Sequence, residues 1–121
     1  MDSTIQALMQ TCREDGLRWF PHSQTPENLT LCLAGEVGEI ANIMKKVVRG
    51  DFTIFDAVLD EGLAEEVVDA LIYLLSLMGH PDFQGVNWQH IWDRKRKFNE
   101  ERFGTPPMDE ADYHYEKGRT Q

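Results

Sequence analysis

The chain is poor in cysteine and lacks long apolar runs. Its two cysteines, Cys12 and Cys32, form no CxxC or zinc-like pair, so the sequence indicates neither a disulfide framework nor a zinc site. The longest apolar stretch, 70–78, is far shorter than the roughly 20 residues of a membrane span, and nothing at the N-terminus resembles a signal peptide. We therefore expect a cytoplasmic protein with reduced thiols and no membrane partner.

Positive charge is also scarce, because 12 Lys and Arg residues face 21 Asp and Glu residues, which leaves a net charge of −9. Such a balance argues against a protein that binds nucleic acid through a broad basic surface. It does not exclude binding of an anionic small molecule, since a bound cation reverses the sign of the charge at an acidic site. The content of 41% hydrophobic and 27% charged residues is that of an ordinary globular domain and argues against disorder.

The sequence also lacks the signature of β-strands, because no segment alternates between apolar and polar residues with a period of two. The apolar residues have helical spacing throughout. The four helices that we expect span about residues 2–15, 26–48, 63–78 and 88–103. Gly16, Gly50 and Gly79 are the stop signals of the first three helices, and Thr25 is the N-cap of the second.

The sequence thus predicts an all-α fold, a four-helix-type bundle over residues 1–104. Residues 51–62 form a linker with a short helical turn, and a polar tail follows at 105–121, loosely ordered or docked on a partner. The helix at 63–78 is apolar nearly all round, so it should be the most buried element.

Two pairs of carboxylates, each pair three residues apart, are the main functional signal: Glu36 with Glu39, and Glu66 with Asp69. Each pair lies on one helical face, and an antiparallel packing of the two helices would bring four carboxylates together. A single ExxE is common on a solvated acidic face, but these pairs lie in apolar surroundings, where a carboxylate needs a cation beside it. An all-oxygen set fits Mg²⁺, with Mn²⁺ as a substitute, and the di-iron Glu-x-x-His, EF-hand and P-loop patterns are missing.

Basic residues on the last helix are a second candidate group, since Lys95, Asn99 and Arg102 fall on one stripe. This stripe suits phosphate, sugar or base contacts, and it is equally typical of a solvated basic helix. Lys46 is a further candidate for phosphate contact or an ordinary helix C-terminal lysine.

Two aromatic residues have two possible roles each, contact with a ligand or packing in the core. Trp19, with Phe20 and His22 nearby, can stack on a base or belong to the core. Tyr73 lies one turn after Asp69 and can hydrogen-bond a ligand or line the bundle.

Three segments together resemble a known family. EVGE at 36–39 followed by EEVVD at 65–69 is similar to the ExxE…ExxD signature of MazG-like all-α nucleotide pyrophosphohydrolases. The lead-in PENLTLCLAGEVGE resembles the corresponding segment of the dCTP pyrophosphatase branch, and KFNEERFG resembles the Lys…Asn…Arg stretch of the family. The resemblance covers about residues 17–104.

This resemblance implies Mg²⁺-dependent conversion of a (d)NTP to the monophosphate and pyrophosphate, in nucleotide-pool control or sanitation. It also implies a homodimer or homotetramer, which agrees with a third helix too apolar for one small bundle to cover. The implied metal ligands are Glu36, Glu39, Glu66 and Asp69, and Glu39 or Glu65 would orient the attacking water. The implied nucleotide contacts are Trp19, Tyr73, Lys95, Asn99 and Arg102. A non-catalytic helical module that binds nucleotide or a protein partner is the alternative, and a purely structural oligomerisation bundle is a third.

Overall fold

The computed structural model describes residues 3–104, and every regular element within this range is a helix, which confirms the all-α prediction. In chain order the elements are α1 (Ser3–Trp19), η1 (Pro21–Ser23), α2 (Pro26–Arg49), α3 (Ile54–Asp60), α4 (Leu63–Met78), η2 (Pro81–Phe83) and α5 (Trp88–Phe103). The tail predicted at 105–121 lies outside the described residues. None of the helices between residues 3 and 104 is both long enough and apolar enough to cross a membrane.

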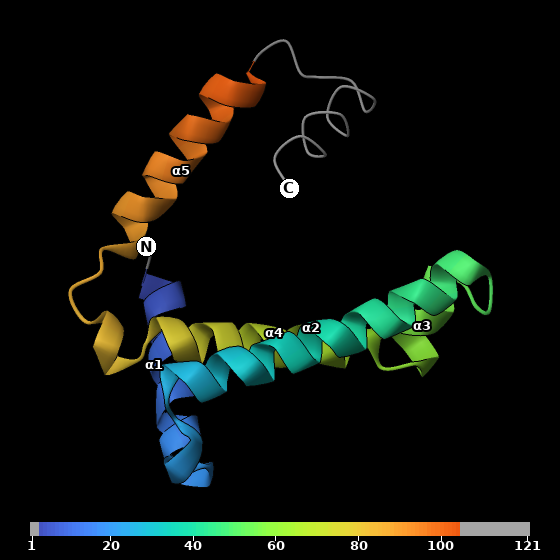
Figure 1. Cartoon of the computed structure of the whole chain (residues 1–121), viewed down its shortest axis with the longest axis horizontal. Coiled ribbons are helices and arrows are strands. Elements are labelled where there is room, and N and C mark those ends of the chain that lie inside the picture. The colour runs from blue at the N-terminus through green and yellow to red at the C-terminus, as the bar shows by residue number, and fades with distance from the viewer. Residues whose placement is uncertain (1–2, 105–121) are drawn as a thin grey trace. The chain divides into compact units, whose positions relative to one another are not determined.

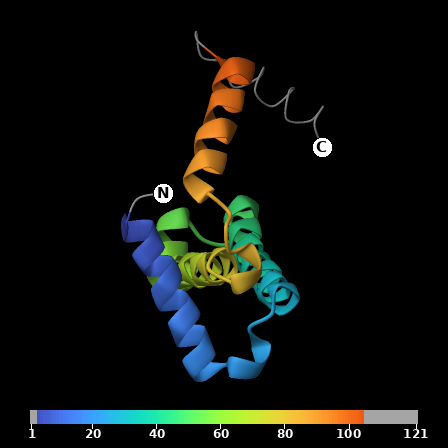
Figure 2. The same ribbon diagram turned by 90° about the vertical axis from the view of Figure 1, so that its left-hand side faces the viewer.

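The chain divides into two compact units, Asp2–Val86 and the segment from Asn87 onward that carries α5. Within the first unit, α2 and α4 lie side by side and antiparallel, with α3 at the turn between them (Figure 1). Helix α1 packs against α4, and a view turned by 90° shows α4 nearly end-on between α1 and α2 (Figure 2). Helix α4 is therefore the central element of this unit.

Local capping explains why α2 begins and ends where the sequence predicts. The Thr25 hydroxyl accepts a hydrogen bond from the Asn28 backbone N–H at 3.1 Å, and Pro26 occupies the first turn, where its missing N–H has no consequence. At the other end Gly50 adopts the left-handed conformation with φ 89°, and the Asp51 N–H donates to the Lys46 carbonyl. These contacts span at most five residues, so the sequence suffices to place them.

One predicted helix end is wrong, and one predicted helical turn is longer than expected. Gly16 does not end the first helix, because α1 continues through it to Trp19, and the Phe20 N–H donates to the Gly16 carbonyl at 2.8 Å. The helical turn predicted within the linker at 51–62 is present as α3, a helix of 7 residues. A capping box starts α3, in which Thr53 and Asp56 each accept a hydrogen bond from the other's backbone N–H.

Within residues 3–104, α4 carries more buried residues than any other helix, as predicted for the apolar segment at 63–78, but much of its apolar surface stays exposed. The buried residues of α4 are Leu63, Leu75 and Ser76. Large apolar side chains elsewhere on α4 are 42% to 52% exposed: Val67, Val68, Leu71, Ile72 and Leu74. The reason is that α1 and α2 cover only part of a helix that is apolar around most of its circumference.

Candidate metal centre and adjoining cavity

Three carboxylates meet across the α2–α4 pair. Glu36 comes from α2, and Glu66 and Asp69 come from successive turns of α4; one oxygen of each lies within 4.8 Å of the others. The antiparallel packing of the two helices brings the two acidic pairs toward each other, because residues at i and i+3 share a helical face. Three converging carboxylate oxygens form a donor set that a hard divalent cation prefers.

The three carboxylates differ in their exposure. Glu36 and Glu66 are partly buried, whereas Asp69 is exposed. The expectation that Asp69 lies in buried apolar surroundings is therefore wrong for the single chain. Its neighbours Val67 and Val68 are 49% and 52% exposed, so this side of α4 is open.

The surroundings of Glu36 in this triad raise its pKa to about 7, well above the ordinary value of 4.5. The largest cause is a side-chain hydrogen bond with Glu66, followed by desolvation and by the negative charges of Glu66, Asp69 and Glu39. All of these contributions raise the pKa, and each comes from burial or from another carboxylate. A divalent cation would remove the repulsion, so the residues present fit a bound Mg²⁺ or Mn²⁺.

A cavity of about 440 Å³ leads from the triad to the far end of α1. Glu36 and Asp69 line one part of it, and Trp19 and Phe20 line another. The remaining lining residues are Thr11, Cys12, Asp15, Gly16, Gln24, Leu29, Ile72, Tyr73 and Ser76. The volume lies within the range of small-molecule sites, and the lining combines the aromatic side chains Trp19 and Phe20 with the carboxylates of Glu36 and Asp69.

Tyr73 lies in the wall of this cavity, on the same α4 face as Asp69. Burial raises the pKa of the Tyr73 phenol above its usual value, and the nearby Cys32, Glu36 and Asp69 raise it further. The hydroxyl therefore stays protonated at neutral pH and can donate a hydrogen bond. The phenol also has a hydrogen bond with Cys32, so Tyr73 lines the cavity and its contact with a ligand stays a prediction.

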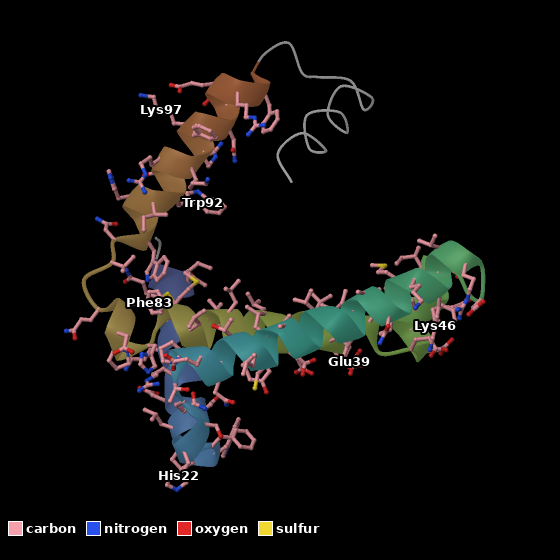
Figure 3. The ribbon with its side chains drawn as sticks, in the orientation of Figure 1. His22, Glu39, Lys46, Phe83, Trp92 and Lys97 are labelled. Carbon is pink, nitrogen blue, oxygen red and sulfur yellow. The ribbon has the colours of Figure 1, made fainter. Side chains whose placement is uncertain are left out.

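The two candidate catalytic carboxylates flank the triad rather than belong to it. Glu39 is exposed one turn beyond Glu36 on α2 (Figure 3), and its charge contributes to the raised pKa of Glu36. Glu65 is exposed on α4 and lines a shallow hollow of about 280 Å³ together with Asp69. Both side chains are thus near the triad and accessible to water.

The basic candidates lie on other parts of the chain. Lys46 is near the C-terminal end of α2 (Figure 3), about 15 Å along the helix axis from Glu36 at 1.5 Å per residue, and it does not line the cavity. Lys95, Asn99 and Arg102 lie on α5, which belongs to the second unit. There Lys95 lies over the ring of Phe98, with Nζ 5.4 Å from its centroid.

The contribution of α1 is the part of the site that the sequence analysis missed. Thr11, Cys12 and Asp15 face the cavity from this helix, and Gln24 follows it in the connection to α2. All three residues lie within the helix predicted at 2–15, but the sequence does not show which face of that helix packs beside the acidic pairs. The packing of α1 on α4 decides this.

A scan of protein-family models, a search of curated proteins and a search of solved structures found no match to this chain.

Proposed function

We propose that the protein is a Mg²⁺-dependent nucleotide pyrophosphohydrolase that converts a (d)NTP to the (d)NMP and pyrophosphate. The observation that carries the proposal is the cavity in which two members of the carboxylate triad, Glu36 and Asp69, share walls with Trp19 and Phe20. A nucleotide has the same two-ended chemistry, because an anionic phosphate chain that binds divalent cations is joined to a flat apolar base.

Each residue group has a role in this proposal. Glu36, Glu66 and Asp69, with Glu39 beside them, would hold Mg²⁺ or Mn²⁺, which when bound neutralises phosphate charge and polarises a phosphoryl oxygen. Glu39 or Glu65 orients a water molecule and accepts its proton, since both carboxylates are exposed beside the triad. Tyr73 donates a hydrogen bond to the bound nucleotide, and Trp19 stacks on its base.

The basic residues are assigned to the phosphate chain. Lys95 and Arg102 supply positive charge from α5, with Asn99 between them on the same stripe as an amide donor. Lys46 is a further phosphate contact in the proposal, and it lies on α2 outside the residues that line the cavity.

We propose a homo-oligomer for a physical reason that concerns the first unit. Helix α4 exposes large apolar side chains such as Val67, Val68 and Leu71 along much of its length. A surface of this kind is stabilised when another apolar surface covers it, at about 25 cal/mol per Å². A dimer or tetramer of the chain provides that cover.

The experiment that tests the activity measures pyrophosphate and monophosphate release from the common ribo- and deoxyribonucleoside triphosphates, with Mg²⁺, with Mn²⁺ and with EDTA. We expect metal-dependent release in equal amounts, and loss of turnover with a retained fold in the Asp69→Asn variant. Metal-independent release, or an active Asp69→Asn variant, contradicts the proposal. Tight nucleotide binding without any release supports the alternative, a non-catalytic helical module on the same scaffold.

A further inference from the structure

The aromatic end of the cavity is attached to the rest of the unit through Gln24, a residue between η1 and α2. The Gln24 side-chain amide donates from Nε2 to the Phe20 carbonyl at 3.2 Å. This bond closes the turn that begins at Trp19 and Phe20, both of which line the cavity although each is 62% exposed. The Gln24 side chain therefore helps to hold the backbone turn that carries these two rings.

A second contact holds the backbone of Gln24 to the end of α4. His80 Nε2 lies 3.0 Å from the Gln24 carbonyl oxygen, 56 residues away in the sequence, and the imidazole is largely buried with 11% of its side chain exposed. The other ring nitrogen, Nδ1, accepts a hydrogen bond from the Asp82 backbone N–H at 3.0 Å. Because Nδ1 is the acceptor, the neutral ring carries its proton on Nε2 and donates it to Gln24.

Gly16 makes room for the side chain of Gln24. A Cβ atom at position 16 would lie 2.4 Å from Gln24 Oε1, so the amide end of the Gln24 side chain would have to move from the position in which it bonds Phe20. A glycine inside a helix costs about 1 kcal/mol relative to alanine, and Gln24 Oε1 is itself buried without a hydrogen-bond partner in residues 3–104. Both the glycine within the helix and the buried oxygen without a partner destabilise the fold locally. Such features together are typical of a functional site.

We propose that His80 and Gly16 are positioning residues, which hold Gln24 and through it fix the Trp19–Phe20 wall against which the base of the nucleotide binds. The inference rests on the proposed function for the identity of the ligand, but the placement of the wall can be measured without one. His80 acts at the aromatic end, where its polar partners within residues 3–104 are Gln24 and Asp82 rather than the carboxylate triad. Its loss weakens binding and leaves the chemical step unchanged.

Two substitutions of His80 separate its two hydrogen bonds. His80→Gln keeps a donor near the position of Nε2, and so retains the bond to Gln24 while losing the acceptor for Asp82. His80→Asn keeps the acceptor near the position of Nδ1 and loses the bond to Gln24. Both variants are made in the full chain carrying Trp88→Phe and Trp92→Phe, so that Trp19 is the sole tryptophan of the three.

The first measurement is acrylamide quenching of Trp19 fluorescence in the ligand-free protein. We expect His80→Asn to increase the quenching constant and His80→Gln to leave it at the value of the parent. Gly16→Ala should increase it as well, and Gly38→Ala is the matched control, because a Cβ at position 38 meets no atom within 4 Å. Equal quenching in His80→Asn and His80→Gln overturns the proposal.

The second measurement separates KM from kcat for the best triphosphate. We expect His80→Asn to raise KM by about 3- to 10-fold, as one lost hydrogen bond does, with kcat changed less than about twofold. His80→Gln should keep the parental KM, and an equal fall of kcat in both variants contradicts a positioning role. If the parent protein hydrolyses no nucleotide, the proposed function fails, and the quenching comparison alone decides whether His80 positions the wall.

Discussion

Without a divalent cation, the carboxylate triad should make the protein less stable as the pH rises from about 4.5 to about 7. The folded pKa of Glu36, about 7, is above the ordinary value of 4.5 that the carboxyl regains on unfolding. Between these two values the folded state binds more protons than the unfolded state, so the free energy of unfolding falls with increasing pH. The stabilising contribution is complete below about 4.5 and lost above about 7.

The size of the effect follows from the same two values. A tenfold difference in proton affinity corresponds to about 1.4 kcal/mol, so the separation of the two pKa values sets an upper limit of about 3 kcal/mol. Because the triad is partly open to solvent, screening reduces the expected loss to about 1 kcal/mol, or about 4–8 °C in Tm for a unit of this size. A bound Mg²⁺ takes the place of the proton on Glu36. The stabilisation of the fold by Mg²⁺ should therefore increase as the pH rises from about 4.5 to about 7.

The assay is thermal unfolding at a series of pH values between about 5 and about 8, in EDTA and in millimolar Mg²⁺. The Glu36→Gln variant should lose most of the pH dependence in EDTA, because its amide does not titrate. Glu14→Gln is the matched control, since Glu14 is an exposed carboxylate of α1 outside the triad, and its pH profile should follow that of the parent.

Two results would refute this reasoning. The first is a pH dependence in EDTA that persists unchanged in Glu36→Gln. The second is equal stabilisation of the parent and of Glu36→Gln by Mg²⁺ at about pH 7.5, where the carboxylate should be needed to bind the ion.

Three further predictions concern other parts of the chain. Leu71→Glu should reduce the mass in size-exclusion chromatography with light scattering, because it places a charge on the exposed apolar side of α4; an unchanged mass contradicts the proposed interface. Lys95→Ala should raise KM for a triphosphate by about tenfold with little change for Lys97→Ala, because residues 95 and 97 point to different helical faces; equal effects argue against the stripe. Gly50→Ala should lower the free energy of unfolding by about 1 kcal/mol in urea titrations, since φ 89° strains any side chain, and no loss would show that the turn adapts.

The sequence was sufficient for features that depend on short-range contacts. It predicted the start of α2 at Pro26 with Thr25 as its N-cap, and the end of α4 before Gly79, because caps and stop signals act over a few residues. It failed at Gly16, where helix propensity alone favours a stop. The partner that explains this glycine, Gln24, reaches it only through the fold of the connection between α1 and α2.

Within the candidate site, the sequence by itself determined that two carboxylate pairs lie on single helical faces, since the helical period of 3.6 residues fixes this. Only the tertiary structure decided that Glu36 meets Glu66 and Asp69 while Glu39 lies outside the triad, because the register of α2 against α4 selects the contacting turns. The cavity was likewise decided by the packing of α1 on α4, which depends on side chains far apart in the chain. Periodicity is a local property of the backbone, whereas register and cavity shape arise from the packing of whole helices.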